Sequence, residues 1–305
     1  MINYSKFLKS KSLAIFLFHG VINKNPFNIR NYTKKHLLTT EFEKVLNDLS
    51  NKGGKCLSLD AVYKKIKKKE PFEDYSYSIT FDDGFYNNYK YAVPILAKKK
   101  LYATFYITTD FIDKNLMSWI DKIEHMVENS KTKKKINIFG KKLSFQNNNK
   151  SKIKFLNKVR QLAKNNSKVN LNELVETVRK QMGLKKSLNK LNNILDKKMS
   201  WKNVKKINTY PLFSIGGHTN SHPILSYLSF KDCKKEIEGS IKYIKKNTGI
   251  ILKHYSYPEG LFHTYGNREI QILKKNKIKI CPSAEFGLNN IKSNLFNLRR
   301  IFVNR

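Results

Sequence analysis

Short apolar runs recur along the chain and alternate with segments that have helical spacing. The runs are rich in β-branched and aromatic residues and are bounded by polar or turn residues, which is typical of buried strands. The predicted strands span residues 13–18, 76–81, 103–107, 212–215, 250–257, 278–283 and 298–303. Repeated strand–helix units favour an α/β protein with a parallel sheet, most economically a partial or distorted (β/α) barrel.

The intervening helices carry recognisable start and stop signals. Thr40 and Glu43 form a capping-box pattern, Asp60 is the predicted cap of the next helix, and Pro94 predicts a kink or a late start within a third helix. A longer helix is predicted from Ser229 to Gly249, where glycine is the expected C-terminal residue. The remaining predicted helix spans residues 267–275.

The alternation is interrupted between residues 113 and 205, a stretch rich in Lys, Asn and Leu. Apolar residues at helical spacing predict a mostly helical insertion within a single domain that spans residues 1–305. The insertion contains no cluster of metal-ligating residues in the sequence. We therefore expect it to shape a substrate cleft or a docking surface.

The charge balance is strongly basic, with 60 Lys and Arg against 23 Asp and Glu, for a net charge of +37. Such a balance favours an anionic partner: nucleic acid, acidic lipid headgroups or a charged glycan carrier. The lysines occur in short scattered runs and do not interleave with aromatic residues, so a membrane surface or carrier is favoured over nucleic acid. Drift in base composition is the alternative explanation.

Cysteine content and hydropathy indicate the compartment. Three cysteines lie far apart and form no C-x-x-C pair, which argues against a disulfide framework or a thiolate zinc site. The apolar run 13–18 is too short for a signal-peptide core, and no run is long enough to span a membrane. The expected location is cytoplasmic, with peripheral attachment at the inner face of the membrane as a further possibility.

Polar residues follow the predicted strands at their carboxyl ends. His19, Asp82–Asp83, His218 and Pro258 each lie directly past a strand. In β/α barrels the carboxyl ends of the strands form the edge where active-site residues converge. We therefore expect these side chains to meet in one site.

Two adjacent carboxylates, Asp82 and Asp83, repel each other unless a cation or hydrogen bonds stabilise them. Because successive residues face different ways, one carboxylate can bind a metal while its neighbour acts as a base. A plain turn or helix cap is the alternative. His218 and His222 are four residues apart and can bind one metal ion from a single helical turn. Two histidines and a carboxylate leave positions open for water, as in hydrolytic metal sites.

These segments resemble a known enzyme family. Thr80-Phe81-Asp82-Asp83-Gly84 and His218-Thr219-x-x-His222-Pro223 are similar to the first two motifs of the polysaccharide deacetylases, the family-4 carbohydrate esterases with the NodB homology domain. The resemblance implies a partial β/α barrel, Asp82 as the general base, and a divalent metal ion, expected to be zinc, on Asp83, His218 and His222.

The segment Ser256-Tyr257-Pro258-Glu259-Gly260 matches the family's third motif in part. The resemblance implies that Tyr257 and Pro258 line the substrate cleft and that the Glu259 N–H binds the oxyanion. Ser256 stands where many members have the arginine that orients the base. Arg300 is the candidate substitute, and a solvated charge is the alternative interpretation of that residue.

The family's fourth motif is not found, and no histidine follows His263 to supply the fifth. The context Phe18-His19-Gly20 resembles a permuted subgroup similar to the poly-glucosamine deacetylases, in which the first strand provides the general acid. An imidazole can protonate a leaving amine, although His19 could instead be hydrogen-bonded at a strand end for structural reasons. The other histidines, His36, His125, His254 and His263, have no partner at a useful spacing and are expected at the surface or behind the site.

The sequence thus predicts a metal-dependent hydrolase that removes an N-acyl group, with acetyl as the first expectation, from an amino sugar. The expected substrate is an intermediate of surface-polysaccharide synthesis on a polysaccharide, lipid or nucleotide carrier. A deformylase, an O-deacetylase, and a catalytically silent module that binds glycans or membranes remain alternatives. The sequence does not identify the sugar, the acyl group or the metal.

Overall fold

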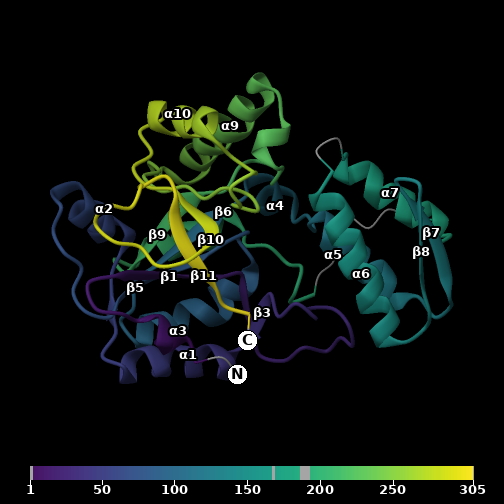
Figure 1. The fold of residues 1–305 in the computed structure, drawn as a ribbon, viewed down its shortest axis with the longest axis horizontal. Coiled ribbons are helices and arrows are strands. Elements are labelled where there is room, and N and C mark those ends of the chain that lie inside the picture. The colour runs from purple at the N-terminus through teal and green to yellow at the C-terminus, as the bar shows by residue number, and fades with distance from the viewer. Residues whose placement is uncertain (1–2, 167–168, 186–192, 305) are drawn as a thin grey trace. The chain divides into compact units, whose positions relative to one another are not determined.

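The computed structural model describes residues 3–166, 169–185 and 193–304. The chain forms two compact units (Figure 1). Unit 1 comprises residues 3–23, 34–115 and 198–304, and unit 2 comprises residues 24–33 together with the described part of 116–197. Among the described residues, no helix combines the length and hydropathy that a membrane span needs.

Unit 1 is built on a parallel sheet, which confirms the predicted α/β fold class. The strand order is β10-β11-β1-β5-β6-β9, and the short β4 pairs with β5. All residues of β1 and β5 are buried, as expected for strands covered on both faces. The strands are β1 (Leu13–Phe18), β4 (Lys55–Cys56), β5 (Ser76–Phe81), β6 (Ala103–Ile107), β9 (Phe213–Gly217), β10 (Pro282–Phe286) and β11 (Leu298–Phe302).

The sheet does not close into a barrel, and the reason lies in the segment 250–257. A strand was predicted there, but the segment forms only two isolated parallel bridges, from Tyr255 to Gly217 and from His254 to Ile280. The chain then turns away at Pro258, with Glu259 and Gly260 both at positive φ. This turn stops the ladder that would otherwise join β9 to β10. The neighbouring predictions 212–215 and 278–283 were correspondingly displaced toward the N-terminus of the observed strands β9 and β10.

Helices pack on both sides of the sheet. Figure 1 shows α9 and α10 on one side of the strands and α1 and α3 on the other. Side chains of β1, β5 and β6 form the main hydrophobic core together with residues of these helices. The helices of unit 1 are α1 (Thr39–Asn51), α2 (Leu59–Lys68), α3 (Val93–Lys98), α4 (Thr109–Lys114), α8 (Trp201–Asn208), α9 (Phe230–Thr248) and α10 (Asn267–Lys275).

Two predicted helix caps were wrong by two residues. Helix α2 is capped by Ser58, whose hydroxyl accepts from the Ala61 N–H, whereas Asp60 pairs with His254. At the start of α1, the carboxylate of Glu41 rather than Glu43 accepts from the Leu38 N–H. In both cases the helix begins two residues before the predicted position.

Short elements complete unit 1. Strands β2 (Gly20–Ile22) and β3 (His36–Leu38) form a separate parallel pair. A π-helical turn, Asn88–Ala92, precedes α3, so Pro94 lies in the first turn of that helix, where proline is tolerated. The remaining short elements are the 3-10 turns Tyr4–Phe7 and Leu225–Tyr227.

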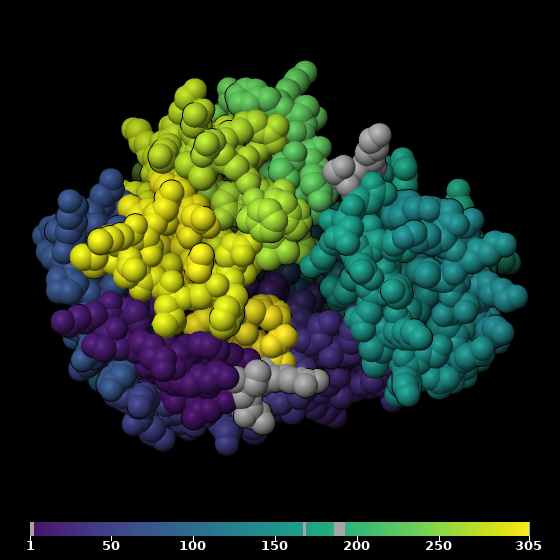
Figure 2. All heavy atoms as spheres, in the orientation of Figure 1, coloured from purple at the N-terminus to yellow at the C-terminus, as the bar shows by residue number. Residues whose placement is uncertain are grey.

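The two ends of the chain lie together in unit 1. Strand β11 pairs with β1, and the Asn304 N–H donates to the Tyr4 hydroxyl at 3.2 Å. Figure 2 shows the yellow C-terminal residues directly against the purple N-terminal segment. The last strand therefore lies beside the first in the middle of the sheet, where it can contribute to the same site.

Unit 2 has its own hydrophobic core and contains a hairpin that the sequence analysis missed. Helices α5 (Trp119–Asn129), α6 (Asn149–Lys164) and α7 (Leu171–Gln181) pack with β7 (Lys134–Ile138) and β8 (Lys141–Phe145). The hairpin turns at Phe139 and Gly140, which both adopt positive φ, as a tight antiparallel turn requires. A buried ion pair between Arg30 and Asp196 attaches residues 24–33 to this unit.

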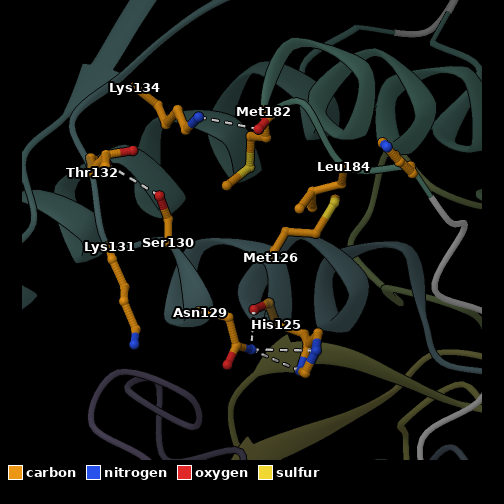
Figure 3. A pocket seen from close by; sticks show the side chains of 10 residues that line it. His125, Met126, Asn129, Ser130, Lys131, Thr132, Lys134, Met182 and Leu184 are labelled. Carbon is orange, nitrogen blue, oxygen red and sulfur yellow. Dashed lines mark hydrogen bonds between the residues drawn. The ribbon is translucent and has the colours of Figure 1, made fainter.

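A hollow of about 400 Å³ opens in unit 2 (Figure 3). Helix α5 ends beside it, and Met182 and Leu184 follow directly after α7. Lysine side chains suit such helix ends because the C-terminal carbonyls carry partial negative charge, and Lys134 donates to the Met182 carbonyl at 3.1 Å. The hollow is lined by His125, Met126, Asn129, Ser130, Lys131, Thr132, Lys134, Met182, Leu184 and Lys185. It contains none of the predicted site residues.

Candidate active site

The predicted metal ligands converge at the carboxyl edge of the unit 1 sheet. Asp83 follows β5, and His218 follows β9 two strands away. The Asp83 Oδ1 atom lies 3.6 Å from His218 Nε2 and 3.4 Å from His222 Nε2. These three donors form a compact group that could hold one metal ion.

The chemistry of this group fits a divalent metal ion. Asp83 Oδ1 is buried and has no hydrogen-bond partner among the residues that the structure describes. A buried carboxylate oxygen without a donor is costly unless a cation stabilises it. Two imidazoles and one carboxylate are an ordinary donor set for such an ion, although they do not fix its identity.

Burial and nearby charges set the protonation states of both the carboxylate and the imidazole ligands. Burial raises the pKa of Asp83, but the nearby histidines and Lys198 lower it more, so the carboxyl is ionised. Burial lowers the pKa of His218 to about 4, which keeps the imidazole neutral and able to bind a metal. His218 Nδ1 lies 2.8 Å from the Ser256 carbonyl, which favours a proton on Nδ1 and leaves the Nε2 lone pair free.

The histidines are held by a loop, not by the helical turn that their spacing suggested. Thr219 and His222 both adopt positive φ, and the His222 N–H donates to the Thr219 hydroxyl at 3.0 Å. Glu236 of α9 fixes the middle of the loop: its carboxylate accepts from the N–H groups of Asn220 and Ser221, each at 2.9 Å, and from the Ser221 hydroxyl at 2.8 Å. No pattern in the sequence marks Glu236 for this role.

The two glycines before His218 allow close packing at the end of β9. Gly216 and Gly217 lie within β9, and their φ angles are not positive. A Cβ atom on Gly216 would lie 2.4 Å from the Tyr106 ring, and one on Gly217 would lie 2.4 Å from the Tyr255 ring. Glycine is therefore needed for close packing against two aromatic rings and not for a sharp turn.

Asp82 is held by Arg300 in a buried bidentate ion pair. Arg300 Nη1 and Nη2 donate to Asp82 Oδ1 and Oδ2, each at 2.9 Å, and Nη2 also donates to the Ser256 hydroxyl at 2.9 Å. Arg300 is 1% exposed, so it is not a solvated charge. Burial raises the pKa of Asp82, but Arg300, His218 and His19 together hold it below its ordinary value.

His19 lies at the same edge, directly after β1. Burial lowers its pKa, while the charges of Asp83 and Asp82 raise it and those of Lys35 and Arg300 lower it. The imidazole therefore lies within the field of both carboxylates. Its ring meets Phe302 edge-to-face, with the ring centroids 5.2 Å apart.

The residues of the third-motif segment, 256–260, lie partly at the site and partly in the hydrophobic core. Pro258 is buried, and Glu259 is partly exposed with φ +60°, a strained conformation of the kind found at functional sites. Tyr257 differs from the expectation that it lines the cleft. Its ring stacks on Tyr265, its hydroxyl donates to the Phe296 carbonyl at 3.0 Å, and the side chain is 1% exposed, so it belongs to the core.

Lys198 is a second neighbour of the site that the sequence analysis did not single out. It forms an isolated antiparallel bridge with Phe85, two residues after Asp83. Its ammonium lies 3.3 Å from the centroid of the Phe85 ring and 5.0 Å from that of Phe111. The side chain is buried, and its charge helps to keep Asp83 ionised.

Two of the remaining histidines, His36 and His254, are hydrogen-bonded in the interior of unit 1. His36 and His254 are buried rather than exposed: His36 Nδ1 lies 3.0 Å from Asn87 Nδ2, and His254 Nε2 lies 3.2 Å from Asp60 Oδ1. Their burial is explained by hydrogen bonds to partners that are distant in the sequence, which the spacing of residues along the chain does not reveal.

Comparison with known families agrees with this geometry. The family model described as polysaccharide deacetylase matches residues 69–137 and 157–280, well over half of the chain. The chain belongs to the polysaccharide deacetylase family. It is therefore a hydrolase of the kind that acts on amide bonds. The matched segments contain Asp82, Asp83, His218 and His222, whereas His19 and Arg300 lie outside them.

Solved structures share the fold over nearly the whole chain. The deacetylase PplD from Streptococcus pyogenes, solved in complex with acetate, is 17% identical, with 96% of this chain and 92% of that chain covered and a TM-score of 0.61. IcaB from Ammonifex degensii is 13% identical, with 97% and 93% covered and a TM-score of 0.59. The de-N-acetylase from Aggregatibacter actinomycetemcomitans is 12% identical, with 96% and 95% covered and a TM-score of 0.59. No curated protein matches the chain in sequence.

Proposed function

We propose that this protein is a metal-dependent deacetylase that removes an N-acetyl group from an amino sugar, with Asp82 as its general base. The observation that carries the proposal is the pairing of two differently held carboxylates. Asp82 is locked by Arg300, while the adjacent Asp83 presents an oxygen without a hydrogen-bond donor to two imidazoles.

Asp83, His218 and His222 would hold the metal ion, with zinc as the first expectation. When bound, such an ion lowers the pKa of water and stabilises negative charge on oxygen. The remaining chemistry belongs to the side chains of this chain. Asp82 accepts a proton from the water molecule whose oxygen attacks the amide carbon, and Arg300 keeps the Asp82 carboxylate oriented and ionised.

The second half of the reaction breaks the C–N bond. The Glu259 N–H stabilises the oxyanion of the tetrahedral intermediate, a role that needs no particular side chain. Protonated His19 gives its proton to the departing nitrogen, so that the products are a carboxylate and a free amine. His19 follows β1 directly, at the carboxyl edge of the sheet that also carries Asp82 and Asp83 after β5, and this position supports the assignment.

The net charge of +37 supports a negatively charged carrier for the amino sugar. We propose a lipid-linked or nucleotide-linked intermediate of surface-polysaccharide synthesis, met at the cytoplasmic face of the membrane. A polysaccharide without charged groups would gain nothing from this basic surface beyond its contacts in the site.

Metal analysis of the purified protein, combined with an amine-release assay over N-acetyl and N-formyl amino sugars, tests the proposal. We expect stoichiometric metal and amine release that stops after chelation and returns with the metal. Preference for an N-formyl sugar would indicate a deformylase, and release of acetate without amine from an O-acetylated sugar added to the panel would indicate an O-deacetylase. Stoichiometric metal without hydrolysis of any substrate would contradict the proposal and favour a binding module.

A further inference from the structure

One exposed aromatic side chain, Phe302, lies at the edge of the site without a role in the chemistry proposed above. Side chains alternate along a strand, so Leu298, Arg300 and Phe302 of β11 share one face. Arg300 on that face reaches Asp82. Phe302 lies two residues further along the strand, about 7 Å nearer the carboxyl edge where the site opens.

Contacts fix the position of the Phe302 ring relative to His19. Residue 302 pairs with Leu17 of β1, and the Val303 N–H donates to the Leu17 carbonyl at 2.9 Å. His19 follows on that neighbouring strand, and the two rings meet edge-to-face with an interplanar angle of 79°. The aromatic ring is therefore held beside the imidazole by the strand pairing itself.

Exposure sets Phe302 apart from its neighbours. It is 36% exposed, whereas Ile301 and Val303 on either side are each 1% exposed. A ligand that covers this ring removes apolar surface from water, which favours binding. Pyranose rings suit this position because they present an apolar face of C–H groups that can stack on a flat ring.

We propose that Phe302 is the platform on which the sugar ring of the substrate stacks. This inference rests on the proposed function, because His19 identifies the side of the site that Phe302 occupies. If His19 protonates the leaving amine, the ring next to His19 lies against the sugar that carries this amine. Phe302 then recognises the sugar and not the acyl group.

The test measures binding separately from turnover. In an Asp82→Asn background, which should leave the substrate intact, calorimetry gives the Kd of an N-acetylglucosamine tetramer. Phe302→Ala should raise this Kd by about 3- to 10-fold, the effect of one aromatic stacking contact. Phe302→Leu should resemble Phe302→Ala because it lacks a flat ring, whereas Phe302→Tyr should stay within roughly twofold of the parent.

Tyr102 provides the matched control. It is 37% exposed and directly precedes β6, at the opposite edge of the sheet, so Tyr102→Ala should leave the Kd unchanged. Thermal unfolding of each variant separates a binding defect from loss of the fold.

Steady-state kinetics in the parent enzyme give the second measurement. Phe302→Ala should raise KM with little change in kcat and should leave the preference between N-acetyl and N-formyl substrates as it is in the wild type. An unchanged Kd for Phe302→Ala, or wild-type binding by Phe302→Leu, would show that the sugar ring does not stack on Phe302. A changed acyl preference would overturn it as well, because the ring would then contact the acyl group. Failure of the wild type to release amine would instead overturn the proposed function, while the binding measurement still reports on Phe302.

Discussion

Replacement of Arg300 by methionine should affect stability and catalysis together. The guanidinium makes two 2.9 Å hydrogen bonds to Asp82, and both side chains are at least 95% buried. Removing one partner of a buried pair leaves an uncompensated charge and typically costs about 3–5 kcal/mol. We therefore expect Arg300→Met to lower the free energy of unfolding at neutral pH by about 3–5 kcal/mol.

The pH dependence has a definite sign. In the wild type the folded-state pKa of Asp82 is depressed, so its ionised form contributes stability above the unfolded pKa, and this contribution is lost as pH falls through the folded value. In Arg300→Met, burial acts without its main opposing charge, and the Asp82 pKa rises. The stability difference between the two proteins should therefore be larger at neutral pH than in mild acid.

Urea unfolding at two pH values and the pH profile of kcat/KM measure these effects. The acid limb of the profile should move to higher pH in Arg300→Met, since the base must be ionised to act. Arg300→Lys keeps the charge but loses the bidentate geometry, so it should fall between the wild type and Arg300→Met in both measurements. An unchanged acid limb together with unchanged stability in Arg300→Met would refute the reasoning.

Four further predictions concern single residues. Glu236→Ala should weaken metal binding by about 10- to 100-fold, measured by chelator competition, because the loop that carries His218 and His222 loses its anchor. Glu238→Ala on the same helix is the control and should leave the affinity unchanged. Equal metal affinities in the two variants would exclude this role for Glu236. His19→Ala should remove the basic limb of the pH–rate profile, and an unaltered profile would exclude His19 as the acid. Gly217→Ala should destabilise unit 1, measured by thermal unfolding, because its Cβ would overlap the Tyr255 ring, and wild-type stability would show that the ring moves freely. Ser58→Ala should cost about 1 kcal/mol of unfolding free energy as a lost helix cap, and no change in urea unfolding would contradict that assignment.

Strand-end residues were predictable from sequence because parallel strands bring their carboxyl ends to one edge. The runs before His19 and Asp82 were bounded correctly, because the first is wholly apolar and the second alternates Ser or Thr with apolar residues up to the acidic pair. Hence the meeting of Asp83 with His218 and His222 followed from topology and motif spacing alone.

Features that depend on tertiary contacts were not predictable. Arg300 could be proposed as the partner of Asp82 but not distinguished from a surface charge, because its burial depends on β11 lying beside β1. Glu236 gave no signal, since a helical glutamate in a basic chain resembles any solvated residue. The strand expected at 250–257 was wrong because the segment forms isolated bridges at His254 and Tyr255 instead of a continuous ladder, and an apolar pattern does not specify which partners a segment finds.

The most direct test of the account compares two isosteric variants of adjacent residues, Asp82→Asn and Asp83→Asn. Bound metal and amine release are measured on each purified protein alongside the wild type. The account predicts that Asp82→Asn retains stoichiometric metal without turnover, because the base is lost and the ligands remain. Asp83→Asn should lose metal, because its carboxylate is the ligand that faces His218 and His222. Equal metal content in the two variants, or normal amine release by Asp82→Asn, would contradict the division of the two carboxylates into base and ligand.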